Sequence, residues 1–274
     1  MPKVWRTIIF FFIVIAMQFV AAVWLRFTPL RELDFDLQLI LSQLLAFAVS
    51  SVLYVVVTRQ KFSEVIPLKW VGVVNVVLIV FITLAVIPAS WLVSYVSGLF
   101  FVNHIEGVVI SIAGFGFLRA FLAIAITPSI CEELVARGVF MHDFKKKRPW
   151  VQIVASGLLF GLLHLNFQQF FYTFFLGCVF GWLVYKTGSV ISAMLAHLVV
   201  NGLAVVQLMF IDVYEVAEAT ATLEEVPQIA IVAVFSGITL AGLVFGVGLL
   251  VLFNDWNNNR NRKLSQPVRR VEWL

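Results

Sequence analysis

Two adjacent carboxylates and a guanidinium interrupt an apolar stretch near the middle of the chain: Glu132, Glu133 and Arg137. Each charge placed in a membrane-spanning helix costs about 2.5–3.5 kcal/mol on insertion scales, so such residues are retained where they face a polar cavity and have partners. A carboxylate in such a cavity can act as the base that removes a proton from water. These residues therefore indicate an active site within a bundle of membrane-spanning helices.

The spacing of these residues predicts two different roles for the two carboxylates. Glu133 and Arg137 are four residues apart on a helix, so they can form an ion pair that lowers the cost of burying either charge. Glu132 is rotated by about 100° from Glu133 and can point toward the bundle interior. We expect Glu132 to be reactive and Glu133 to be structural.

Partners for Glu132 are expected from three further polar residues, His164, His197 and Asn201, which lie in apolar stretches of their own. His197 and Asn201 are four residues apart and share one face of a helix. An imidazole can share the proton of a water, and an amide can donate hydrogen bonds to a developing oxyanion. Phe160 lies one turn before His164, where its ring can pack beside the imidazole.

The composition predicts the class of protein that holds these residues. The chain is 62% hydrophobic and 12% charged, about half the charged fraction of soluble domains. The fold class is therefore all-α, a polytopic bundle of membrane-spanning helices. The net charge of +4 is spread over short loops and a tail without a nucleic-acid-binding motif, so no nucleic-acid partner is expected.

Hydropathy predicts about eight transmembrane helices, because roughly 20 apolar residues cross the hydrocarbon core. They cover residues 7–24, 38–57, 71–97, 110–143, 150–166, 168–185, 189–211 and 228–253. The fourth is long enough to tilt strongly or to begin with a separate piece, and Pro128 can kink it. We expect one domain over 1–253, with the catalytic core in helices four to seven (110–211) and a basic tail over 254–274.

The distribution of basic residues predicts the orientation. With both termini in the cytoplasm, 15 of the 19 basic residues lie inside, two (Arg26 and Arg31) lie outside, and two (Arg119 and Arg137) lie within spans. The last outer loop, from Asp212 to Gln228, is acidic. The prediction is a multi-pass integral membrane protein with both the N- and C-termini cytoplasmic.

The same orientation predicts that the polar residues share one depth. Glu132, His164, His197 and Asn201 lie 11 to 16 residues from the nearest inner basic residue. At 1.5 Å per helical residue this corresponds to roughly 16–24 Å from the inner surface. We therefore expect four side chains from three helices to meet in one layer.

These residues form an ordered set of three motifs. The set is Glu132-Glu133-x-x-x-Arg137, Phe160-x-x-x-His164 and His197-x-x-x-Asn201. It resembles the motifs of the CAAX protease and bacteriocin-processing family (CPBP, or abortive-infection family), intramembrane proteases that include the Ras-converting CAAX endopeptidase.

The resemblance implies a role for each motif. It implies that Glu132 and His164 activate a water and that His197 and Asn201 stabilise the oxyanion. It implies that Glu133, Arg137 and Phe160 support the site. It also implies a metal-independent reaction without a cofactor, in the bilayer, on a peptide or a lipidated protein.

Several alternatives remain open from the sequence. Two histidines and two glutamates could hold zinc, although a His-Glu-x-x-His motif is absent. A buried Glu–His relay is also expected in a proton-coupled transporter. A catalytically silent scaffold or immunity protein that binds a membrane partner is a third class. The substrate, prenylated CAAX protein or bacteriocin leader peptide, and the oligomeric state are left open.

Three other ionisable residues are interpreted as peripheral. His104 and His142 lie in or near connecting segments and are expected to be interfacial residues, not ligands. Arg119 is expected to snorkel to the outer surface or to pair with Glu106.

Overall fold

The computed structural model describes residues 3–102, 106–210 and 228–265, and these ranges contain helices and no strand. Six helices are long and apolar enough to cross a membrane: Val4–Arg26, Phe35–Val57, Val73–Gly98, Phe167–Thr187, Ile191–Met209 and Val232–Asn259. The predicted all-α polytopic bundle is confirmed, and the protein is an integral membrane protein. The predicted cytoplasmic location of the termini stays a prediction, and the acidic loop 212–227 and His104 lie outside the described residues.

Two of the eight predicted spans lie outside those six helices. Helix α10 (Pro149–Leu163) is apolar but shorter. The other is a continuous helix over residues 117–144, which carries five charged side chains. It consists of α7 (Phe117–Ala120), the π-helical η3 (Phe121–Ile126), α8 (Thr127–Glu133), the π-helical η4 (Leu134–Phe140) and α9 (Met141–Phe144). The total of about eight spans stays a prediction.

The fourth predicted span, 110–143, is interrupted near its start, which is one of the two alternatives that its length allowed. Helix α6 (Glu106–Ala113) ends before a break, and the chain resumes a helix only at Phe117. Gly116 in the break has a φ of +90°, a conformation that glycine adopts without steric cost. The span therefore begins with a separate piece, as its length indicated.

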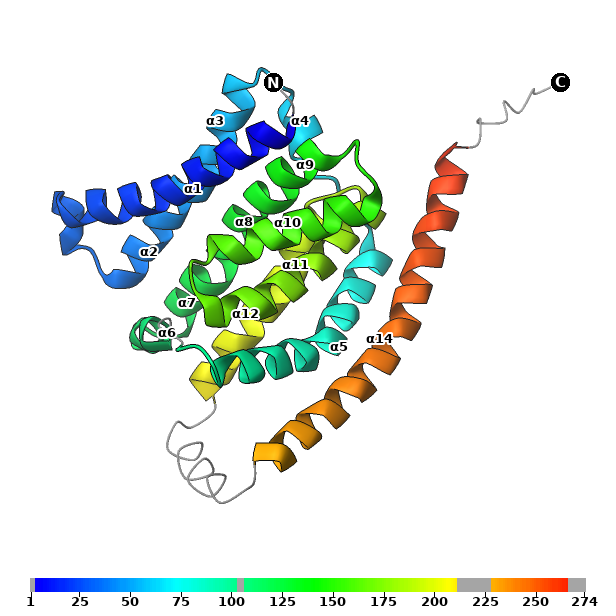
Figure 1. The fold of residues 1–274 in the computed structure, drawn as a ribbon. Coiled ribbons are helices and arrows are strands. Elements are labelled where there is room, and N and C mark those ends of the chain that lie inside the picture. Colours follow the sequence, from blue (N-terminus) through cyan, green and yellow to red (C-terminus); the bar gives the residue numbers. More distant parts are fainter. Residues whose placement is uncertain (1–2, 103–105, 211–227, 266–274) are drawn as a thin grey trace.

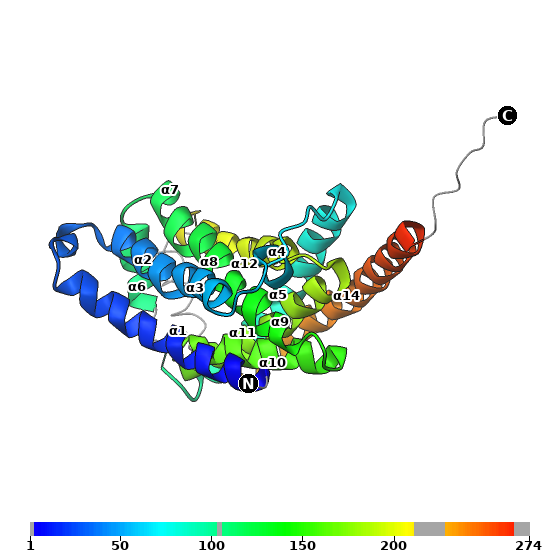
Figure 2. The same ribbon diagram turned by 90° about the horizontal axis from the view of Figure 1, so that it is seen from above.

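The helices of the motif region lie in the middle of the bundle. Helix α1 (Lys3–Arg26) and helix α14 (Gln228–Ser265) lie at opposite edges in two perpendicular views, with α8, α10, α11 (Phe167–Thr187) and α12 (Ile191–Phe210) between them (Figures 1 and 2). Around α1 lie the 3-10 turn η1 (Pro29–Glu32), α2 (Phe35–Gln43), the π-helical η2 (Leu44–Val49) and α3 (Ser50–Val57), and the short helix α4 (Phe62–Val65) follows α3. The motifs are thus enclosed on several sides by helices outside the motif region.

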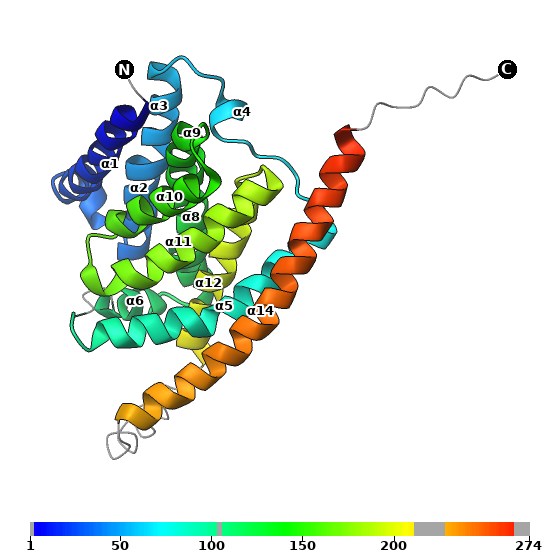
Figure 3. The same cartoon turned by 45° about the vertical axis from the view of Figure 1, so that its right-hand side comes forward.

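Helix α14 packs along α5 (Val73–Gly98), as Figure 3 shows. Asn75 and Asn257 exchange two amide hydrogen bonds of 3.1 and 3.0 Å, and both side chains are buried. Asn257 lies beyond residue 253, and α14 continues through the predicted start of the tail to Ser265.

Small residues allow α10 and α11 to approach closely. Gly157 and Gly161 on α10, and Gly177 and Gly181 on α11, have the small-xxx-small spacing that brings membrane helices into backbone contact. Gly157 meets Gly177 directly, Gly161 faces Phe170, and Gly181 faces Ile153 and Ser156. A Cβ atom built on Gly177 would lie only 2.9 Å from the Cα atom of Gly157. The contact therefore requires glycine on α11.

Two peripheral residues differ from the expectations. The Nε and Nη2 atoms of Arg119 donate to Asp36, and Nη2 also donates to Asp34 at 2.7 Å, so Arg119 joins α7 to the start of α2. The side chain of Glu106 lies outside the described part. His142 is buried, with its Nδ1 atom 2.8 Å from the carbonyl oxygen of Glu64. It is a packed structural residue, and the interfacial interpretation is wrong.

Candidate active site

The two carboxylates of the first motif lie in different environments. Both end α8, immediately before the π-helical η4, an irregularity that is frequent at functional sites. Glu133 is fully buried, and its Oε1 atom accepts a hydrogen bond of 2.8 Å from Nη1 of Arg137. The side chain of Glu132 is 16% exposed and lines a cavity. Only Glu132 is open to a substrate.

Arg137 connects the first motif to two other helices. Its Nη2 atom donates a 2.8 Å hydrogen bond to the carbonyl oxygen of Gly177 on α11. Its guanidinium carbon lies 4.4 Å from the ring centroid of Phe160 on α10, within the range of a cation–π contact. The close approach of α10 and α11 thus positions both partners of one buried cation.

His197 on α12 is oriented by the buried carboxylate. Its Nδ1 atom lies 2.9 Å from Oε1 of Glu133, which can only accept a hydrogen bond, so Nδ1 carries the proton. In a neutral imidazole the Nε2 atom then holds the lone pair, and it lies 3.2 Å from Nδ2 of Asn201, a donor. The contacts on both sides of the ring select the same tautomer.

Asn201 is held by a carbonyl group that a proline leaves free. Pro128 has no N–H, so the carbonyl of Ile124, four residues earlier, lacks its α-helical donor. The Nδ2 atom of Asn201 donates to that oxygen at 2.9 Å. Pro128 therefore acts on the third motif as well as on the shape of its own helix.

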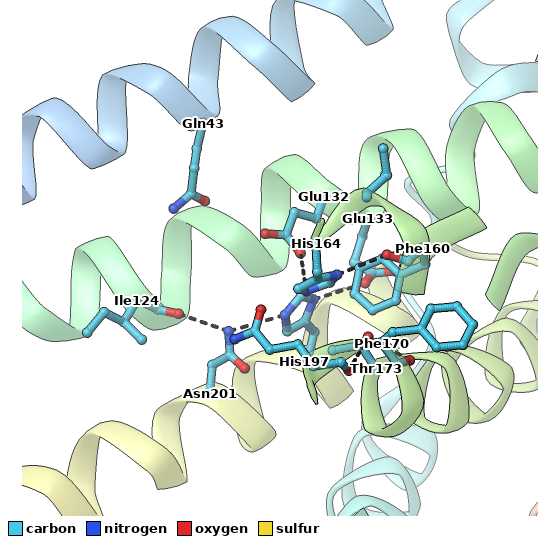
Figure 4. Close-up of polar contacts among 12 residues, drawn as sticks. Gln43, Ile124, Glu132, Glu133, Phe160, His164, Phe170, Thr173, His197 and Asn201 are labelled. Atoms are coloured by element: carbon cyan, nitrogen blue, oxygen red, sulfur yellow. Dashed lines mark hydrogen bonds and ion pairs between the residues drawn. The ribbon is translucent and has the colours of Figure 1, made fainter. Parts of the chain in front are cut away.

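His164 lies at the C-terminal end of α10 and faces Glu132 (Figure 4). Its Nδ1 atom donates to the carbonyl oxygen of Phe160 at 2.9 Å, which leaves the lone pair of a neutral ring on Nε2. The Nε2 atom lies 4.0 Å from Oε2 of Glu132. For a water oxygen about 2.8 Å from both atoms, the angle between the two acceptors at the water is about 90°. The water can therefore donate one hydrogen bond to each of them.

The chain leaves this helix end in a strained conformation. Leu165, which follows His164, has a φ of +51°. This left-handed region is unfavourable for a bulky side chain and occurs mostly where the surrounding structure enforces it. The turn directs the chain into α11, which packs back against α10.

A cavity of about 320 Å³ connects the two halves of the site. Glu132 and His164 line one part of it, and His197 and Asn201 line another. A second cavity of about 260 Å³ adjoins it and is also lined by Glu132 and His164. The structure thus brings all four predicted catalytic residues to one cavity, which Phe160 also lines, while Glu133 and Arg137 are buried and line neither cavity.

Sequence reasoning missed two polar residues and one contact. Gln43 on α2 and Gln169 on α11 line both cavities. Each is a polar residue within a predicted span, which is the signal that could have found it. The hydrogen bond from His197 to Glu133 was also missed, because Glu133 was expected to pair only with Arg137.

The described residues contain no ready-made cluster of metal ligands. A catalytic zinc takes three protein ligands and a water, and within the described ranges no group of three or more His, Cys, Asp or Glu is arranged to hold a metal. Glu132 and His164 supply two donors, while Glu133 and the Nδ1 atom of His197 bond to each other.

Part of the chain matches the model of a known protein family. Residues 114–203 match the family model described as type II CAAX prenyl endopeptidase Rce1-like. This part of the chain is similar to that family. The match spans all three motifs and confirms the resemblance that they carry, and this family indicates CAAX-type intramembrane protease activity. No curated protein and no solved structure matched the chain.

Proposed function

We propose that the protein hydrolyses a peptide bond of a membrane-associated peptide or lipidated protein with a water activated by Glu132 and His164. One observation carries this proposal: the carboxylate oxygen and the imidazole lone pair face each other across 4.0 Å in a cavity. A water that donates a hydrogen to each acceptor directs its own lone pair away from them, toward a bound carbonyl carbon. The Rce1-like match supports the same reaction class.

The reaction balances with the residues present. The water oxygen bonds to the carbonyl carbon, its proton passes to the Glu132 carboxylate, and the carbonyl electron pair moves onto oxygen. When the tetrahedral intermediate collapses, the C–N bond breaks and Glu132 returns the proton to the leaving amine. Glu132 thus acts first as base and then as acid, as hydrolysis without a protein nucleophile requires.

The developing oxyanion is assigned to His197 and Asn201. Asn201 donates to the Ile124 carbonyl and to Nε2 of His197, so substrate binding must turn its second N–H from the imidazole toward the oxyanion. If His197 takes a proton on Nε2, it also becomes a donor, and the adjacent Glu133 carboxylate stabilises its positive charge. The reaction requires no cofactor or metal in this proposal.

The test is cleavage of a tagged candidate substrate by purified protein in lipid nanodiscs. We expect Glu132→Gln and His164→Ala each to lower kcat by about 10²–10⁴-fold, the usual contribution of a general base. Glu64→Gln is the control, because the Glu64 side chain is exposed. Prenylated and unmodified peptides, compared in the same assay, separate the two substrate classes. Unchanged cleavage by folded Glu132→Gln would reject the mechanism.

A further inference from the structure

The second cavity of about 260 Å³ lies between α1, α2 and the junction of α10 with α11. It shares Gln43, Glu132, His164 and Gln169 with the first cavity. Glu132 and His164 therefore lie where the two cavities meet, and the proposed mechanism uses only the first cavity. A cavity of this size is much larger than the volume of about 30 Å³ that one water occupies in the liquid.

Gln43 lies at the same border with an unused hydrogen-bonding atom. Figure 4 shows its side chain extending from its helix toward Glu132 and His164. Its Nε2 atom makes only a long hydrogen bond of 3.4 Å to the carbonyl oxygen of Ala123. Its Oε1 atom is buried and has no hydrogen-bond partner. Because buried polar atoms are nearly always paired, this atom is suited to a donor that arrives with a ligand.

The second cavity also continues toward one end of the bundle. It shares Ala22, Leu39 and Ser42 with a third hollow of about 600 Å³. Charged residues line that third hollow where α1 connects to α2, among them Arg26 and Glu32. A continuous series of hollows thus leads from a charged rim to the catalytic pair.

We propose that the second cavity is a substrate subsite that holds an extended peptide segment next to the scissile bond, with Gln43 hydrogen-bonding its main chain. This inference rests on the proposed function. Every residue of an extended peptide presents an N–H donor and a C=O acceptor, which match the two ends of a primary amide. An acyl chain offers no donor to the buried Oε1 atom, so the chemistry favours a peptide over a lipid.

The first test replaces the amide of Gln43. We expect Gln43→Met, which keeps the length of the side chain, to raise KM about 3–10-fold, the effect of one lost neutral hydrogen bond. The kcat should be unchanged, because Glu132 and His164 are untouched. Gln43→Asn should recover part of the affinity. A purely structural role would instead lower the folded yield without this KM effect or its recovery.

The second test blocks the entrance. Ala22 is exposed on α1 and lines both the second and third hollows, so Ala22→Trp fills the route without entering the packed core. We expect a higher KM for a long peptide and no change for a short one that fits the first cavity. Val23→Trp is the matched control, because Val23 is exposed beside it and lines none of the three hollows.

The outcomes separate this inference from the proposed function. If the wild-type protein cleaves and Glu132→Gln does not, the proposed function stands. If Gln43→Met and Ala22→Trp then both have the KM of the wild-type protein, the subsite proposal is rejected. A lipid that fills the cavity would give this result, with a change only in the thermal stability of Ala22→Trp. A wild-type protein that cleaves no peptide rejects both.

Discussion

His197 and Glu133, 64 positions apart in the chain, are joined by a 2.9 Å hydrogen bond from Nδ1 to Oε1. The same oxygen accepts the hydrogen bond from Arg137. One buried carboxylate therefore neutralises a buried cation and fixes the tautomer of an active-site imidazole. The second glutamate of the first motif links that motif directly to the third.

This link predicts a catalytic effect for a residue that the substrate does not touch. Glu133→Gln keeps the size of the side chain but removes the charge that stabilises a protonated His197. We expect kcat to fall more than tenfold with a smaller change in KM, measured on the folded fraction. Glu64→Gln, at an exposed site that lines none of the three cavities, is the control. A wild-type kcat in folded Glu133→Gln would contradict this role.

The buried ion pair predicts that single substitutions of its members destabilise the fold more than a double substitution does. Arg137→Ala and Glu133→Ala each leave one buried charge unpaired, which costs about 3–5 kcal/mol. We expect low folded yields for both in size-exclusion chromatography and thermal unfolding. The double variant Glu133→Leu/Arg137→Met should be folded better than either single one. Arg31→Ala, which breaks an exposed pair, should have no measurable effect.

The packing of α10 on α11 predicts that replacing Gly177 with alanine destabilises the fold, whereas replacing a glycine outside this contact does not. A methyl group on Gly177 would lie 2.9 Å from the Cα atom of Gly157 and 3.2 Å from Nη2 of Arg137. We expect Gly177→Ala to destabilise the fold by about 1–3 kcal/mol and to lower activity, because the two helices must separate. Gly237→Ala in α14 meets no atom within 4 Å and should be neutral or slightly stabilising. Equal melting temperatures for the two variants would disprove this account.

The donor set predicts a reaction that survives metal removal. Protein purified after chelator treatment should keep the kcat of untreated protein, with zinc far below one equivalent by elemental analysis. Added zinc should not increase the rate. Loss of activity on chelation, restored in proportion to bound zinc, would support the zinc alternative.

Much of the architecture was predictable from particular residues. Long apolar runs can satisfy their backbone groups in a bilayer only as helices, so the fold class followed from hydropathy. The polar residues within these runs indicated the candidate site, because Glu132, His164, His197 and Asn201 are costly to expose to lipid, and the structure brings all four to one cavity. The spacing of Glu133 and Arg137 predicted their ion pair, which the structure contains.

Other features depended on contacts between distant segments. The partners of Arg119 are two aspartates more than 80 positions away, and the carbonyl that holds Asn201 belongs to another helix. Local spacing contains no signal for such contacts. The break before Phe117 was suggested by length alone, and its position required the backbone conformation of Gly116.

The sequence alone determined that this is a helical membrane protein, because charge and hydropathy act locally along each helix, and it predicted a common depth for one acid, two imidazoles and an amide. The tertiary structure decided which carboxylate is open, which ring nitrogen holds each proton, and which hollows adjoin the catalytic pair. Those properties depend on how helices far apart in the chain approach one another, and small residues such as Gly157 and Gly177 set that approach.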